Sequence, residues 1–353
     1  MASTRTPVPP GVDGGDVVRA ASRPRPRRRW PMVVWTVVAV LVIGAGLIAT
    51  ARSGGGDSAR ARLAVIAPAA PGGGWDLVAR ESQQALKSEG VVNNVQVVNI
   101  PGAAGTIGLG QLADMTGQGG TLMVTGTVMV GGIIANDSDA TLADVTPIAR
   151  LAEDFEVIVV PGDSPYQTLD ELLEAWRADP PGTAIGGGSK GGTDHLLAGL
   201  VAESAGIDPT QLNYLAFSGG GEALNALLAN TVTASISGYN EFADQIEAGN
   251  VRALAMGTRE RVEGIDVPSL GEQGVDVELT NWRGLVAPPG LSDDQREQLT
   301  DIVTEMVQGA AWQDTVARNR WKDTFLTGAD FEQFIQAETA RIQDIATELG
   351  IGA

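Results

Sequence analysis

After residue 62 the sequence repeats one local pattern: a short run of β-branched and apolar residues, a glycine-rich turn, and a segment with helical periodicity. The first copy runs from Leu63 to Gly90 and includes LAVIA, PGGG and WDLVARESQQALKSEG. Similar copies start near residues 95, 183, 212 and 232. Parallel strands need a long crossover between them, which is usually a helix. The repeat therefore predicts an α/β fold with a parallel sheet.

The repeat is interrupted once, and this interruption predicts two lobes. DVTPIARLAEDFEVIVVPGDSP reads as two further strands and a Pro/Gly break, and the repeat resumes after Pro161. NWRGLVAPPG then crosses back, and two C-terminal helices close the chain. We expect the first lobe to comprise 63–165 and 285–353, and the second lobe 166–284. Two α/β lobes joined by two crossings form a hinged clamp with its cleft between them.

Composition excludes several kinds of site. The chain has no cysteine and one histidine, so a disulfide, a thiol nucleophile, a thiolate metal site and a multi-histidine cage are all ruled out. The chain has 24 basic and 43 acidic residues. Ten of the basic residues and three of the acidic residues lie in residues 1–62, so the rest of the chain has a net charge of about −26. The electrostatic field of this negative charge repels nucleic acid, so we expect no nucleic-acid partner. Local dipoles must then attract any anionic ligand.

The N-terminal part predicts export. Residues 1–29 form a basic leader rich in proline, glycine and arginine, which we expect to be disordered. Residues 30–49 are uncharged and apolar, and twenty helical residues at about 1.5 Å each can cross a hydrocarbon core of about 30 Å. Ala49–Ala51 fits a signal-peptidase site, so both a cleaved signal and a permanent transmembrane anchor stay open. Either way, the body from about Leu63 is expected outside the cytoplasm, in the periplasm or on the outer cell surface.

The carboxyl ends of the predicted strands are followed by residue types that suit ligand binding more than catalysis. Ligands of open α/β sheets lie beyond these ends. Here they are rich in Gly, Ser, Thr and Asn, and poor in pairs of acids, bases and nucleophiles. Glycines before a helix leave backbone N–H groups uncovered at its N-terminus, which suits an anion. We therefore expect a binding protein and not an enzyme, with no cofactor and no metal. The strand ends are PGGGWD, PGAAGTIG, TGT, GGGSKGGTD, FSGGGEA and SISGYNE.

Three local features invite other interpretations. GAAGTIG (102–108) lacks the spacing of a dinucleotide loop and the acidic residue that would bind a ribose, which disfavours a nucleotide. Asp194 and His195 are adjacent, but neighbouring helical residues diverge by about 100°, so a capping and packing role is favoured over catalysis. Lys190 and Arg283 are the basic residues best placed to meet an anion. A solvated loop lysine and an arginine that bridges the lobes are the alternatives for these two.

Eight segments occur in the order and spacing of a known family. They are APAAPGGGWDLVAR, NIPGAAGTIG, VPGDSPYQTLDELLEAW, GGGSKGGTDHLLAGL, YLAFSGGGEALNALLAN, IEAGNVRALA, VPSLGEQGVDVEL and NWRGLVAPPG. Over residues 63–352 the chain resembles the extracytoplasmic solute-binding receptors of tripartite tricarboxylate transporters, also called Bug-type receptors. GGTDHLLAG and FSGGGEA look most like the branch associated with citrate-like tricarboxylates. The resemblance implies a two-lobed, periplasmic-binding-protein-like clamp (type II-like) that closes on an organic anion.

The resemblance also implies which residues bind that anion. One carboxylate would be held by the loops after the first two strands, and the second lobe would contribute helix N-termini and a strand end. The family's usual second-lobe patterns lack a lysine where Lys190 stands. The residues expected to bind the ligand are Gly72, Gly73, Gly74, Trp75, Asp76, Gly102, Ala103, Ala104, Gly105, Thr106, Thr125, Thr127, Ser189, Lys190, Thr193, Asp194, Ser218, Gly219, Gly220, Ser237 and Tyr239.

These observations favour a monomeric receptor that binds a di- or tricarboxylate and delivers it to integral-membrane permease subunits. A second hypothesis is a sensory receptor with the same clamp and ligand, which docks on the outer domain of a sensor kinase. A third is an exported hydrolase or lyase that uses His195.

Overall fold

A computed structural model describes residues 58–352. The predicted leader (1–29) and the predicted apolar segment (30–49) lie outside the described residues. Among the helices of residues 58–352, none is both long enough and apolar enough to cross a membrane.

In residues 58–352 the strands form one ten-stranded sheet with the order β2-β1-β3-β9-β4-β7-β5-β6, and β8 and β10 both pair with β4. The strands β1 to β3 are parallel to one another, as are β5 to β7. By contrast, β9 and β4 pair antiparallel with their neighbours, so the sheet is mixed and the prediction of a parallel sheet was incomplete. The strands are β1 Arg62–Ala67, β2 Asn94–Asn99, β3 Thr121–Gly126, β4 Thr146–Pro161, β5 Ala184–Gly187, β6 Asn213–Ala216, β7 Ala234–Gly238, β8 Val251–Met256, β9 Thr280–Ala287 and β10 Lys322–Thr327.

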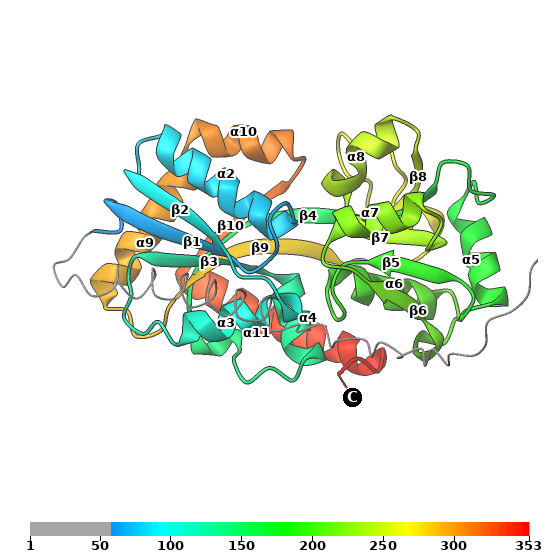
Figure 1. Cartoon of the computed structure of the whole chain (residues 1–353), viewed down its shortest axis with the longest axis horizontal. Coiled ribbons are helices and arrows are strands. Elements are labelled where there is room, and N and C mark those ends of the chain that lie inside the picture. The colour runs from blue at the N-terminus through cyan, green and yellow to red at the C-terminus, as the bar shows by residue number, and fades with distance from the viewer. Residues whose placement is uncertain (1–57, 353) are drawn as a thin grey trace, which may run out of the picture. The chain divides into compact units, whose positions relative to one another are not determined.

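Helices cover both faces of this sheet. Around β1 to β3, helices α2 and α10 lie on one face, and α3, α4 and α11 on the other (Figure 1). Around β5 to β7, helices α7 and α8 lie on one side and α6 on the other (Figure 1). The α-helices are α2 Gly74–Ser88, α3 Thr106–Ala113, α4 Thr127–Ala135, α5 Leu169–Ala178, α6 Thr193–Ser204, α7 Gly220–Leu228, α8 Tyr239–Glu247, α9 Asp293–Gln308, α10 Ala310–Arg318 and α11 Gly328–Glu348. The short 3-10 helices are η1 Ala103–Gly105, η2 Leu142–Asp144, η3 Pro209–Gln211 and η4 Gly271–Gln273.

Strand β4 connects the two groups of elements. Residues 146–155 pair with β9, and residues 156–161 pair with β7 and β8. The sequence analysis expected two strands here, whereas the structure has one strand of 16 residues. Register shifts near Pro147 and Arg150 mark irregularities that let the long strand bend without ending. Because β4 forms hydrogen bonds with β9 along one half and with β7 and β8 along the other, it continues as a single strand.

We call β1 to β3, α2 to α4, α9 to α11 and β10 the first lobe, and α5 to α8 with β5 to β8 the second lobe. Together with β4 and β9, these elements form the predicted α/β two-lobed clamp (Figure 1). The boundaries at 165 and 284 remain a prediction. A cluster of buried apolar side chains around Phe242 and Leu227 belongs to the second lobe, and a larger one includes Trp282 and Phe331.

The C-terminal segment contains more elements than expected. In place of two helices, the structure has α9, α10, β10 and α11. Gly309 has extended backbone angles and separates α9 from α10. The strand β10 pairs antiparallel with β4, from Lys322 opposite Glu153 to Thr327 opposite Ala149. This strand adds an outer pairing partner to the part of β4 that faces the first lobe.

Candidate ligand-binding cleft

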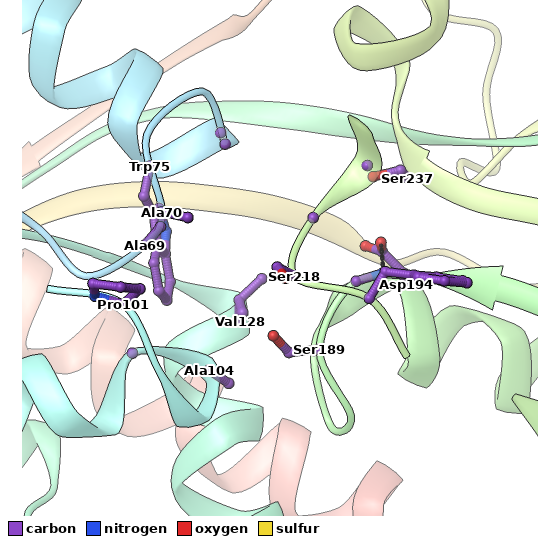
Figure 2. Close-up of a pocket in the computed structure, with 18 of the residues that line it drawn as sticks. Ala69, Ala70, Trp75, Pro101, Ala104, Val128, Ser189, Asp194, Ser218 and Ser237 are labelled. Atoms are coloured by element: carbon purple, nitrogen blue, oxygen red, sulfur yellow. Dashed lines mark hydrogen bonds between the residues drawn. The ribbon is translucent and has the colours of Figure 1, made fainter. Parts of the chain in front are cut away.

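A cavity of about 820 Å³ is lined by residues of both lobes. Figure 2 shows small and apolar side chains of the first lobe on one wall, among them Ala69, Trp75 and Pro101. The opposite wall carries Ser189, Asp194, Ser218 and Ser237 of the second lobe (Figure 2). The cavity therefore has one mainly apolar wall and one polar wall.

On the first-lobe wall, the PGGG turn leads into α2. The first helical hydrogen bond runs from Leu77 N to Gly73 O at 3.0 Å, so the N–H groups of Gly74, Trp75 and Asp76 precede it. Asp76 is buried beneath this turn. Its carboxylate accepts hydrogen bonds of 2.8 Å from Gly72 N and from Arg80 Nε. Burial raises the pKa of Asp76, but the hydrogen bonds from Arg80, Gly72 and Asn99 outweigh it and the pKa is lowered. Asp76 thus holds the turn in place.

The second first-lobe loop, PGAAG, follows β2 and needs its glycines. Gly102 and Gly105 have φ angles of +132° and +91°, which side chains disfavour. A Cβ atom on Gly105 would also lie 2.6 Å from Cζ3 of Trp75 and 2.8 Å from Cε of Met129. The glycine therefore lets the indole of Trp75 pack against this loop. Trp75 is 5% exposed, and its Nε1 atom has no hydrogen-bond partner among residues 58–352.

On the second-lobe wall, an acidic residue in the first turn of each helix fastens the loop before that helix. Asp194 of α6 accepts a hydrogen bond from Gly188 N at 2.7 Å. Glu222 of α7 accepts from Ser218 Oγ at 2.8 Å, and Glu241 of α8 accepts from Ser237 Oγ at 2.9 Å. These carboxylates also place negative charge beside the cavity, because all three acids line it.

Between the two walls, β4 and β9 supply buried polar groups. Nη2 of Arg283 lies 3.5 Å from Oδ2 of Asp154, and Nδ2 of Asn281 donates to Oε1 of Glu156 at 2.9 Å. Burial raises the pKa of Asp154 to about 6, although Arg283 opposes that rise. Burial, with Asp194 and Asp154 nearby, raises the pKa of Glu156 well above its ordinary value. Arg283 and Asn281 line the cavity, whereas the two acids lie behind them.

His195 has a packing role. It is buried, its Nδ1 atom accepts a hydrogen bond from Gly191 N at 3.0 Å, and its ring centroid lies 4.3 Å from that of Tyr214. Burial, with a contribution from Lys190, lowers the pKa of His195 to about 4. Asp194 bonds to the backbone of the preceding loop and not to His195, while Thr193 Oγ1 has no partner in the described chain. In residues 58–352, no group of three or more His, Cys, Asp or Glu side chains could hold a metal ion.

The structure brings most of the predicted binding residues together. Those that line the cavity are Gly73, Gly74, Trp75, Gly102, Ala103, Ala104, Gly105, Ser189, Lys190, Asp194, Ser218, Gly219, Gly220 and Ser237. The predicted residues outside this lining are Gly72, Asp76, Thr106, Thr125, Thr127, Thr193 and Tyr239.

Several residues outside the lining have a structural partner instead. Thr106 Oγ1 donates to Ala103 O at 2.9 Å, within its own loop. Thr127 Oγ1 donates to Thr280 O and accepts from Trp282 N, both at 3.1 Å, and so ties the end of β3 to β9.

Some lining residues were not predicted as binding residues. Arg283 was considered but left undecided, and Asn281 was missed, while Glu241 ends the predicted strand end SISGYNE but was not named as a binding residue. Asn281 is two residues from Arg283, so alternation along β9 places both on one face and could have indicated it. Glu241 follows SISG by three residues, which is the position of a first-turn acid. The other lining residues were not named individually: Pro101, Gly188, Gly192, Phe217, Glu222 and Gly238 belong to the predicted strand ends, whereas Pro68, Ala69, Ala70, Val128, Asn136 and Ala216 lie outside them.

The fold and the cleft define a solute-binding receptor of the periplasmic-binding-protein class. Residues 78–351 match the model of the tripartite tricarboxylate transporter family receptor, so the chain belongs to that family, and the predicted membership is confirmed. Receptors of this family are binding proteins, which also confirms that the chain is not an enzyme.

Individual relatives agree with this assignment. Protein BugT of Bordetella pertussis is 26% identical over 321 residues, which cover 89% of this chain and 96% of BugT. Two solved structures share the fold. MatC from Rhodopseudomonas palustris with bound malate is 22% identical, covers 80% of this chain and 98% of its own, and has a TM-score of 0.69. Rpa4515 of R. palustris with adipate is 21% identical, covers 82% and 97% respectively, and has a TM-score of 0.75.

Proposed function

We propose that the chain binds a small di- or tricarboxylate in the cavity and delivers it to integral-membrane permease subunits. The observation that carries this proposal is the arrangement of helix N-termini: residues from the first turns or N-caps of α2, α6, α7 and α8 all line one cavity. The helix dipoles and the N–H groups that precede the first helical hydrogen bond suit carboxylate oxygens. MatC and Rpa4515, which share the fold, hold malate and adipate.

The energetics are compatible with this ligand class. Hydrogen bonds to a charged group contribute about 1.5–3 kcal/mol each. Three or four of them, less desolvation and immobilisation, reach the roughly −8 kcal/mol of a micromolar complex. Citrate-like tricarboxylates remain the expectation from the GGTDHLLAG and FSGGGEA motifs, with Lys190 beside the cavity as a candidate partner for a third carboxylate.

Thermal unfolding of the full chain in detergent tests the ligand class. The panel contains malate, adipate, succinate, citrate, tricarballylate and aspartate, each with and without EDTA. A ligand at 100 times its Kd stabilises the folded state by about 2.7 kcal/mol, which raises the Tm by several degrees. We expect at least one carboxylate to do this and the uncharged diol 1,4-butanediol to have no effect. A Tm that no carboxylate raises would contradict the proposal.

We also propose that the chain acts outside the cytoplasm, as a monomer, with residues 30–49 as its export signal or membrane anchor. N-terminal sequencing of the protein from fractionated cells decides between a cleaved export signal and a membrane anchor. A mature N-terminus near residue 52 indicates cleavage, while an intact leader in the membrane fraction indicates an anchor. Recovery of the whole protein in the cytosol would contradict export.

A further inference from the structure

We propose that Arg320 and Asn240 are positioning residues for ligand binding. They join the turn between α10 and β10 of the first lobe to helix α8 of the second lobe, and so hold the two lobes in the arrangement that forms the cavity. This inference rests on the proposed function, because it assumes a ligand that both lobes contact. Neither residue lines the cavity, so both act through the position of the lobes and not on the ligand itself.

The first observation is that Arg320 occupies a backbone position that favours glycine. It follows Asn319, the C-cap of α10, and has a φ of +50°. Arg320 N donates a hydrogen bond to Ala317 O at 3.1 Å. Trp321 N donates to Val316 O at 3.0 Å. These two hydrogen bonds form a Schellman motif, which places the residue after the C-cap in the left-handed region. A Cβ atom is unfavourable there, so glycine is the usual residue.

The other helix ends of this kind differ from that of α10. Six other α-helices of residues 58–352 are followed by a C-cap and then by a residue with a positive φ. In all six, that residue is Gly, Asn or Asp, the types that adopt left-handed angles most readily. Arg320 gives up the backbone stability that a glycine would have, so what it contributes comes from its side chain. The six residues are Gly90 after α2, Asp137 after α4, Gly206 after α6, Asn230 after α7, Gly249 after α8 and Gly350 after α11.

The side chain of Arg320 contacts the second lobe at both ends of α8. Its Cζ atom lies over the ring of Tyr239, 5.6 Å from the centroid, where a cation and an aromatic face attract each other. Its Nη2 atom lies 3.7 Å from Oε1 of Glu247. Tyr239 is the first residue of α8 and Glu247 is the last. Because both partners belong to the other lobe, these contacts bear on the relative position of the lobes.

The second observation is independent and concerns Asn240. Its Nδ2 atom donates a hydrogen bond to Asn319 O. Asn319 is the C-cap of α10, and the last carbonyl groups of a helix have no partner within that helix. A side chain of the second lobe thus caps a helix of the first lobe. Two adjacent residues of the α10–β10 turn, Asn319 and Arg320, therefore contact two adjacent residues at the start of α8, Tyr239 and Asn240.

This segment of α8 also belongs to the cavity wall. Gly238 and Glu241 line the cavity, and Tyr239 and Asn240 lie between them in the chain. A motion that moves the start of α8 away from the first lobe would break the contacts to the α10–β10 turn and withdraw this part of the wall at the same time. A ligand that contacts both lobes binds better when the joined arrangement is already populated.

A second cavity shows that packing does not fill the space beside this contact. Its volume is about 970 Å³, and Arg320 and Trp321 line it together with residues 258–264, which follow β8 of the second lobe. Phe155 of β4 lines it as well. The side chains of Arg320 and Asn240 therefore join the lobes at the edge of a gap, where few other groups hold them in register.

The variant Arg320→Gly distinguishes a positioning role from a structural one. A glycine relieves the left-handed backbone, so we expect the Tm of the ligand-free full chain to equal that of the parent or to exceed it by up to about 3 °C. The affinity for malate, adipate or citrate, measured by titration calorimetry, should fall about three- to tenfold, as expected for loss of one cation–π contact and one exposed ion pair. Unchanged affinity would contradict the proposal. A loss of affinity with a Tm below that of the parent would also contradict it, because that combination indicates a structural role.

A distance measurement tests the joint without any ligand. The chain has no cysteine, so two introduced cysteines carry spin labels at chosen sites. Gln84→Cys on α2 and Glu174→Cys on α5 place one label at an exposed position of each lobe. We expect pulsed electron paramagnetic resonance to show a shifted or broader distribution of interlobe distances in Arg320→Gly and in Asn240→Ala than in the parent. Identical distributions would show that neither residue positions the lobes.

Asn230→Gly is the matched control. Asn230 has a φ of +54° after α7 and is exposed, so this variant makes the same kind of backbone change within the second lobe. It should leave both the affinity and the interlobe distances unchanged. If malate, adipate and citrate do not bind the parent, the proposed function fails, while the distances still decide whether Arg320 and Asn240 position the lobes. If they bind and neither variant changes the distances, the positioning role is wrong and the carboxylate receptor stands.

Discussion

Nη2 of Arg283 lies 3.5 Å from Oδ2 of Asp154, and the same guanidinium lies against the backbone of Gly74. Strand β9 thus places one buried cation between an acid of β4 and the PGGG turn of the first lobe. A carboxylate bound at that turn would meet a guanidinium whose position is already set by Asp154. Positioning of this kind lowers the entropy lost on binding.

Replacement of Gly74 by alanine should displace this guanidinium. The new Cβ atom would lie 2.8 Å from Nη2 of Arg283, so the guanidinium must shift from its place beside Asp154. We expect Gly74→Ala to weaken carboxylate binding about tenfold or more and to lower the free energy of unfolding by about 1–3 kcal/mol. Titration calorimetry and urea unfolding measure the two effects. Gly73→Ala is the control for stability, because the nearest atom to its Cβ is Ala70 O at 3.6 Å and its φ is −81°. Equal stability of the two variants would contradict the prediction.

Gly105→Ala should destabilise the fold as well as the site. Its φ of +91° strains any side chain, and the Cβ atom would overlap the ring of Trp75. We expect a loss of about 2–4 kcal/mol in the free energy of unfolding, from backbone strain and overpacking together. Gly110→Ala lies within helix α3 with no atom within 4 Å of its Cβ, so it should stabilise by about 0.5–1 kcal/mol. Urea denaturation followed by tryptophan fluorescence compares them. A Gly105→Ala protein as stable as the parent would show that this glycine is dispensable.

His195 is the one histidine of the chain, so its NMR signal needs no assignment among others. Its pKa is lowered by burial to about 4, and we expect its Hε1 resonance to titrate near that pH and not near 6.5. A folded-state pKa below the unfolded value means that neutral His195 contributes stability above pH 6.5, which is lost progressively as the pH falls toward 4.

The variant His195→Gln isolates this contribution, since Gln keeps an acceptor for Gly191 N but does not titrate. The stability difference between parent and variant should shrink on acidification from pH 7 to pH 4. A difference that stays constant across this range, or a midpoint near 6.5, would show that the imidazole is solvated.

The strand–turn–helix repeat could be predicted from the sequence because glycine turns and helical periodicity are local features. The PGGG, PGAAG and SGGG loops were predicted at the cavity for that reason. Burial is not local: Asp76 shares the PGGGWD motif with cavity-lining residues, yet it faces Arg80 and Asn99 beneath the turn. Asn281 was missed because an antiparallel crossing brings it to the cavity, and the repeat contains parallel strands only. The continuous β4 was missed because its pairing partners come from distant parts of the chain.

Strand β4 pairs with strands of both lobes, and this limits how lobes can be exchanged between such receptors. Residues 146–155 complete the sheet of one lobe, and residues 156–161 complete that of the other. A chimera that exchanges one lobe with a relative must cut this strand or inherit half of it from the wrong parent. Whole-lobe shuffling should therefore be a poor route to new ligand specificity. Substitutions in the short loops at the cavity leave the shared strand intact, and we expect specificity in this architecture to diversify through them.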